Sequence, residues 1–92
     1  MIKSFRDRDT KALYGGAFVR RLQGFRSVAL RKLDMVDAAE RLDDLRWPPN
    51  NRLEALSGER RGQHSIRIND QWRICFTWSD GAAHDVEIVD YH

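Results

Sequence analysis

The sequence is poor in the residues that cross-link small proteins or carry them into membranes. It has 92 residues, of which one is cysteine and two are proline. Because one cysteine cannot form an internal disulfide, we exclude a disulfide-rich secreted scaffold and expect a reducing, cytoplasmic location. No apolar run is long enough to cross a membrane, and residues 1–10 lack the apolar segment of a signal peptide. We therefore expect no membrane association and a single domain spanning residues 1–92.

Motifs for common cofactors are also missing. The three histidines, His64, His84 and His92, lack the spacing of zinc ligands, and a single thiol cannot supply a zinc cluster. The glycines do not fit the phosphate-binding P-loop pattern, and no nucleophile elbow of a serine hydrolase is present. The sequence thus predicts no metal and no cofactor.

The positive charge is carried almost entirely by one residue type. Of the 16 cationic residues, 13 are arginine, against 14 acidic residues. Arginine binds phosphate through a planar fork of donors and stacks on bases, so this bias favours a nucleic acid or an acidic partner. GC-rich coding would give the same bias, and the positions of the arginines must decide between the two explanations.

Apolar spacing predicts two helices in the first half of the chain, after a short strand at residues 2–5. Residues 7–14 form the first predicted helix, with early acidic residues suited to its N-terminal end. Residues 27–45 form the second, with Ser27 as its N-cap and Pro48-Pro49 beyond its end. Its apolar residues recur at three-to-four spacing and make one stripe: Ala29, Leu33, Val36 and Ala39.

The last third of the chain predicts an antiparallel sheet. Residues 64–68, 72–78 and 85–92 alternate between apolar and polar and are separated by turn sequences, while residues 52–58 fit one helical turn or an ordered loop. The predicted fold class is α+β, an antiparallel β-sheet with two N-terminal helices packed on one face. The face toward the helices carries Ile66, Ile68, Trp72, Ile74, Phe76, Trp78, Val86 and Ile88.

The opposite sheet face is predicted to be open and basic. Period-two alternation places on it Ser65, Arg67, Arg73, Cys75, Glu87, Val89 and Tyr91. Two arginines beside a tyrosine suit an RNA backbone and an unstacked base. Arg52, Arg60 and Arg61, on the loops before the sheet, widen this basic surface. The alternative is an ordinary solvated face without a ligand.

The last three residues, Asp90, Tyr91 and His92, offer a carboxylate, a phenol and an imidazole. RNA cleavage through the 2′-hydroxyl needs a base, a cation for the phosphorane and an acid for the leaving oxygen, and requires no metal. Strict alternation points Asp90 inward, so either the strand bulges near its end or Asp90 orients His92. Polar residues without a role are the alternative at a chain end.

Several long segments resemble the HigB toxin family, a branch of the RelE/ParE superfamily of type II toxin–antitoxin systems. The resemblance is carried by residues 51–58, 62–74 and 86–92, together with Lys3-Ser4-Phe5 and residues 31–35. These contiguous matches cover essentially the whole chain and are more specific than a spaced motif. The resemblance implies the small RelE-like fold.

The resemblance also implies an activity and a partner. Members of this family are ribosome-dependent endoribonucleases that cut mRNA at the decoding site of the 70S ribosome. Each is neutralised by a HigA-type antitoxin, a helix-turn-helix protein, and the pair binds operator DNA through the antitoxin. The residues that match the family's active-site positions are Arg73, Asp90, Tyr91 and His92, with Arg67 and Asn69 as RNA contacts.

One departure from the family concerns a phosphate-binding cation. Many relatives carry lysine just before the glycine that corresponds to Gly58, where this chain has Ser57. Arg60 and Arg61 are the candidates to replace that charge. Two alternative functions stay open: a non-catalytic inhibitor of the ParE type that acts on DNA gyrase, and a degenerate toxin that keeps only antitoxin binding.

Overall fold

The computed structural model describes residues 1–91, which contain two α-helices, a four-stranded sheet and four short 3₁₀ helices. The helices α1 and α2 span Arg8–Tyr14 and Arg26–Ala38. The strands β1, β2, β3 and β4 span Glu54–Ala55, His64–Arg67, Trp72–Ser79 and Ala82–Asp90. The 3₁₀ helices η1 to η4 span Arg20–Phe25, Leu42–Arg46, Pro49–Asn51 and Gly58–Arg60. Within residues 1–91 no helix is long and apolar enough to cross a membrane.

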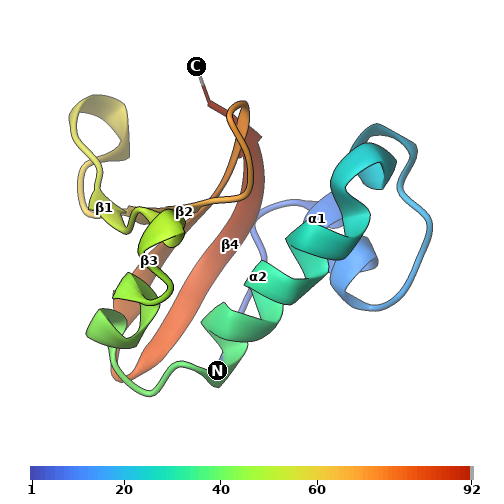
Figure 1. Ribbon diagram of the computed structural model, residues 1–92. Coiled ribbons are helices and arrows are strands. Elements are labelled where there is room, and N and C mark those ends of the chain that lie inside the picture. The colour runs from blue at the N-terminus through green and yellow to red at the C-terminus, as the bar shows by residue number, and fades with distance from the viewer. Residues whose placement is uncertain (92) are drawn as a thin grey trace.

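The sheet is an antiparallel meander in the order β1-β2-β3-β4. It confirms the predicted α+β class and the three strands that alternation indicated (Figure 1). The additional strand β1 pairs Glu54 with Ser65 and Ala55 with His64, in the segment predicted as a helical turn or loop. Two residues are too few to show a period of two, so only the pairing with β2 defines this strand.

The outer edge of β4 is covered by the N-terminus rather than left open. The predicted strand at residues 2–5 is reduced to two isolated parallel bridges, Ile2 to Ala83 and Phe5 to Val86. Between these bridges β4 carries one extra residue, with Asp85 at φ 52°. This bulge lets Ala83 and Val86, three positions apart, both face the core. Covering the edge removes a template for pairing with other chains.

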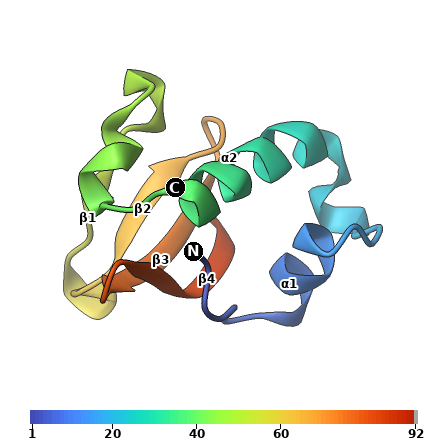
Figure 2. The ribbon, with the colours of Figure 1, turned by 90° about the horizontal axis from the view of Figure 1, so that it is seen from below.

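Both helices lie on the same side of the sheet, as predicted (Figures 1 and 2). The stripe of α2 packs with the inward sheet residues into one cluster, and Leu33, Val36 and Ile74 are fully buried. Helix α1 is joined to β4 by a buried hydrogen bond in which the Ile88 N–H donates to Thr10 Oγ1 at 3.0 Å. Trp72 lies at the border of this core, with its ring centroid 5.0 Å from that of Phe25.

The second helix is shorter than predicted, and Ser27 is not its N-cap. The 3₁₀ helix η1 runs directly into α2, so the helical turns begin before Ser27. At the other end Ala39 is extended, with φ −65° and ψ 131°. The Asp44 carboxylate then accepts the backbone N–H groups of Glu40 and Arg41, each at 3.0 Å, and this local cap starts η2. The apolar spacing continues through residue 45, so it concealed the break.

Phe76 is the largest side chain in the core and provides a test of the assigned sheet face. It is 1% exposed, so Phe76→Ala should lower the free energy of unfolding by about 3–5 kcal/mol through lost contacts and a residual cavity. Urea denaturation measures this loss. The matched control is Trp47→Ala, because Trp47 is 72% exposed and its removal should cost less than about 0.5 kcal/mol. A loss below about 1 kcal/mol for Phe76→Ala would mean that Phe76 does not lie on the sheet face that packs against the helices.

Candidate functional site

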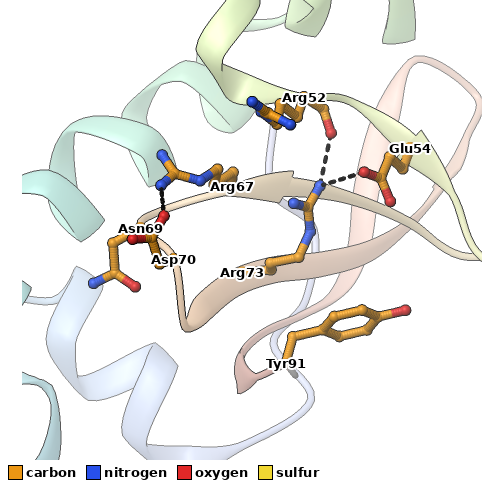
Figure 3. A pocket seen from close by; sticks show the side chains of 7 residues that line it. All are labelled: Arg52, Glu54, Arg67, Asn69, Asp70, Arg73 and Tyr91. Atoms are coloured by element: carbon orange, nitrogen blue, oxygen red, sulfur yellow. Dashed lines mark hydrogen bonds and ion pairs between the residues drawn. The ribbon is translucent and has the colours of Figure 1, made fainter.

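A pocket of about 350 Å³ lies where β2, β3 and the end of β4 meet the segment before β1 (Figure 3). Its walls come from six separate parts of the chain, and most of the lining groups are polar. The lining residues are Arg52, Glu54, Arg67, Asn69, Asp70, Arg73 and Tyr91. Five of these seven were predicted as site residues; Glu54 and Asp70 were not.

Arg73, on β3, forms the buried wall of the pocket and is 9% exposed. Its Nε donates to Ser65 Oγ at 2.8 Å, and its Nη2 donates to the Arg52 carbonyl oxygen at 2.6 Å and to the Ser65 carbonyl oxygen at 3.4 Å. Within residues 1–91, Nη1 makes no hydrogen bond and remains available as a donor to a ligand. The guanidinium is thus held rigidly while part of it stays open.

Arg52 contributes its carbonyl to this arrangement through an unusual backbone conformation. It follows η3 in the left-handed region, with φ 47° and ψ 57°, which is uncommon for a residue with a side chain. This conformation ends the 3₁₀ turn and directs the carbonyl oxygen toward Arg73, while the side chain of Arg52 extends along the pocket (Figure 3). One residue therefore supplies both a structural acceptor and a solvent-exposed cation.

Glu54 is the carboxylate of the pocket that lies next to Arg73, and the sequence-based prediction missed it. Its Oε1 lies 3.9 Å from Arg73 Nη2, and its side chain is 54% exposed. Both groups face the same space (Figure 3). A strand of two residues shows no periodicity, so alternation could not identify Glu54. The only indication in the sequence was that Glu54 lies within residues 51–58, one of the segments that resemble the family.

Two further lining residues are fixed by local hydrogen bonds. The Asn69 side-chain oxygen accepts the backbone N–H groups of Gln71 and Trp72, each at 2.9 Å. This fixes the amide orientation, so the Nδ2 group of Asn69 offers donors only. Arg67 forms an ion pair with Asp70, whose side chain is fully exposed. Such a surface pair contributes about 0–1 kcal/mol and exchanges easily for another anion.

Asp90 and Tyr91 differ in their relation to the pocket. Tyr91 lines the pocket, is 38% exposed and is anchored by its backbone N–H, which donates to the Gln71 carbonyl oxygen at 2.7 Å. Asp90 does not line the pocket; it pairs with Trp72 across the sheet and accepts a hydrogen bond from Gln71 Nε2 at 3.0 Å. The bulge of β4 lies at Asp85, away from this end of the strand. His92 lies outside the described residues, and its role stays a prediction.

The predicted open sheet face is in fact covered near its middle, which corrects the sequence-based expectation. Ser65 and Cys75 are fully buried. Arg60 crosses above Cys75 and donates to Glu87 Oε1 at 2.8 Å, a hydrogen bond that raises the pKa of the guanidinium. Burial likewise raises the pKa of the Cys75 thiol. Neither Arg60 nor the exposed Arg61 lines the pocket, so the structure does not place either of them where the family's lysine would act.

Within residues 1–91 no group of three or more histidine, cysteine, aspartate or glutamate side chains could hold a metal ion. The side chains of the pocket offer three guanidinium groups, two carboxylates, an amide and a phenol. This set suits an RNA phosphodiester, because the arginines can bind its negative charge and a carboxylate can deprotonate the adjacent ribose 2′-hydroxyl.

Comparison with solved structures shows which known fold the chain shares. The chain matches, over its full length, a chain of the YoeB–YefM toxin–antitoxin complex from Staphylococcus aureus, of which 98% is covered. The TM-score is 0.59 and the sequence identity is 17%, a similarity that establishes the fold alone. The two chains thus share one α+β fold.

Sequence comparison identifies the family. The family model for HigB-like toxins, described as the RelE-like toxin of the type II toxin–antitoxin system HigB, matches residues 3–92. The chain belongs to this family. Toxin HigB-1 of Vibrio cholerae is 40% identical over 85 residues, which cover 90% of both chains. Endoribonuclease HigB of Proteus vulgaris is 29% identical over 93 residues, which cover both chains completely.

Proposed function

We propose that this HigB-like toxin is an endoribonuclease that cuts mRNA on the ribosome and acts in the cytoplasm. The observation that carries the proposal is the buried guanidinium of Arg73, which keeps Nη1 available for a ligand and holds Nη2 3.9 Å from Glu54 Oε1. A cation and a carboxylate in one pocket are the two groups that attack by a 2′-hydroxyl requires. The name of the P. vulgaris relative, Endoribonuclease HigB, supports the same activity.

The pocket suggests how the work is divided. Glu54 accepts the proton of the 2′-hydroxyl, whose oxygen then attacks the adjacent phosphorus. Arg73 stabilises the negative charge that develops on the phosphorane oxygens, since its position is fixed before RNA binds. The bond to the 5′-oxygen breaks, and that oxygen receives a proton from an acid. His92 remains our candidate for this acid, and Asp90 remains our candidate for the residue that orients it.

Arg52, Arg67, Asn69 and Tyr91 form the RNA-binding part of the pocket in this proposal. The two arginines contact phosphates that flank the cleaved bond, and the Tyr91 ring provides a surface for one base. Arg60 and Arg61 lie farther out, and of these Arg61 is the more exposed candidate for an additional phosphate contact.

The partners follow from the same proposal. A HigA-type helix-turn-helix antitoxin neutralises the toxin, and operator DNA is bound only through the complex of the two. The S. aureus chain of similar fold belongs to a heterotetrameric YoeB–YefM toxin–antitoxin complex, which supports an antitoxin partner for a protein of this fold. The 70S ribosome presents the mRNA to the pocket.

The test uses the purified chain with 70S ribosomes carrying a defined mRNA, and the same mRNA without ribosomes. We expect cleavage only on ribosomes, mapped by the new 5′ ends, and none with Arg73→Ala. Cleavage of free RNA would show that the activity does not depend on the ribosome. Inhibition of DNA gyrase without any RNA cleavage would support the ParE-type alternative. If the chain neither cleaves RNA nor inhibits gyrase, the degenerate toxin that only binds its antitoxin would be supported.

Glu54→Gln tests the assigned base. The substitution keeps the shape of the side chain but removes its proton-accepting charge, so the cleavage rate should fall about 10²- to 10⁴-fold while ribosome binding is unchanged. The matched control is Glu59→Gln, which removes an exposed carboxylate of η4 that does not line the pocket. Wild-type rates for Glu54→Gln would assign the base to another residue.

Asn69 should read one nucleotide through its fixed donors. Because its oxygen is occupied by two backbone N–H groups, Nδ2 can recognise only an acceptor, such as a purine N7 or a base carbonyl. Asn69→Asp preserves the turn but replaces these donors by an acceptor, and Asn69→Ser removes them without adding charge. Both variants should lose base preference at one position of the cleavage site, as measured by sequencing of the 5′ ends. An unchanged cleavage pattern in both would exclude this contact.

A further inference from the structure

Helix α2 carries a buried lysine that has no carboxylate partner among residues 1–91. Lys32 is 3% exposed, although lysine normally keeps its ammonium in water. Within residues 1–91 its Nζ donates only to amide oxygens: Asn51 Oδ1 at short range and Asn50 Oδ1 at 3.5 Å. Burial lowers the pKa of Lys32, and the positive charges of Arg31 and Arg67 lower it further. A cation kept in such an unfavourable place needs a reason.

The partner of Lys32, Asn51, organises the segment that leads to the pocket. Asn51 is fully buried, and its Nδ2 donates to the carbonyl oxygens of Leu45 and Trp47 at 3.2 and 3.1 Å. With Lys32 bound to its oxygen, this one side chain connects α2 with η2 and η3. The chain leaves Asn51 directly into Arg52.

Arg52 passes this constraint to the pocket. It is the residue in the left-handed conformation, and its carbonyl oxygen accepts the 2.6 Å hydrogen bond from Arg73 Nη2. A movement of Asn51 would move that carbonyl, because the two residues share a peptide bond. The path from Lys32 to Arg73 therefore has three links, each a hydrogen bond or a covalent connection.

We propose that Lys32 is a positioning residue for Arg73, acting through Asn51 and the carbonyl oxygen of Arg52. This inference rests on the proposed function only as far as Arg73 takes part in catalysis. Lys32 does not line the pocket and touches no substrate. Its buried hydrogen bonds fix the loop whose carbonyl orients the guanidinium.

The kinetic test replaces the ammonium by an apolar group of similar length. Lys32→Met leaves Asn51 Oδ1 without its donor, so kcat for cleavage of ribosome-bound mRNA should fall about 10- to 100-fold with KM changed less than about threefold. Lys32→Gln keeps a shorter donor and should lie between Met and the wild type. If Lys32→Met fails to fold, the fall in kcat is measured with Lys32→Gln alone.

A matched control separates positioning from a general loss of stability. Thr10→Val likewise breaks a buried hydrogen bond, here by removing the acceptor of the Ile88 N–H, at a residue of α1 that does not line the pocket. It should lower the free energy of unfolding without changing kcat. An equal loss of kcat in Thr10→Val and Lys32→Met would assign Lys32 a purely structural role.

A double-mutant cycle shows whether Lys32 acts through Arg73. In the Arg73→Lys background the guanidinium and its hydrogen bonds to Ser65 Oγ and the Arg52 carbonyl oxygen are already lost. Adding Lys32→Met should therefore change kcat less than about twofold. A full additional 10- to 100-fold loss in that background would overturn the proposal.

A spectroscopic measurement tests the positioning independently of RNA cleavage. The Nε–H of Arg73 is bonded to Ser65 Oγ and should give a protected NMR signal in the wild type. We expect loss of protection in Lys32→Met and retention in Thr10→Val. Protection that survives in Lys32→Met would contradict the inference, whereas a wild-type chain with this protection but no RNase activity would contradict only the proposed function.

Discussion

The guanidinium of Arg73 is bound by neutral oxygens before any ligand arrives, and the pocket depends on this interaction. A buried guanidinium must have its donors satisfied, or its desolvation would destabilise the fold by several kcal/mol. Here the acceptors are a hydroxyl and two carbonyl groups, and the Glu54 carboxylate is 3.9 Å away. Neutral acceptors fix the orientation without cancelling the charge. The cation thus remains attractive to phosphate while its geometry is already set.

A second buried cation, Lys32 of α2, is likewise bound by neutral oxygens. Lys32 is buried against amide oxygens, and Asn51 donates its own N–H groups to backbone carbonyls. Both cations therefore direct their hydrogen bonds to neutral oxygens, and Arg73 in addition lies 3.9 Å from the Glu54 carboxylate. Since Asn51 and Arg52 are neighbours in the chain, the two arrangements share one loop, and the left-handed conformation of Arg52 joins them. This explains why an energetically costly backbone conformation lies beside the pocket.

Periodicity of apolar residues predicted the regular parts of the fold, and it failed for features that depend on a single hydrogen bond or strand pairing. Alternation gave the three long strands, their faces and the coverage by helices, because burial on one face imposes a period of two. It could not locate β1, because two residues have no period, and so it missed Glu54. The end of α2 depends on the Asp44 cap, and the burial of Cys75 depends on Arg60 reaching across the sheet to Glu87. Neither contact leaves a pattern in the sequence.

The two arginines that face each other across β2 and β3 show why the pocket can hold so much positive charge. Arg67 and Arg73 are direct partners in the register, a pairing that like charges normally disfavour. Each is compensated differently: Arg67 by the exposed Asp70, Arg73 by buried neutral oxygens. A phosphate can displace Asp70 at little cost, because a solvated ion pair contributes at most about 1 kcal/mol. Arg73 keeps its hydrogen bonds to Ser65 Oγ and to the Arg52 carbonyl oxygen. An incoming RNA therefore meets one cation that exchanges its partner and one that does not have to move.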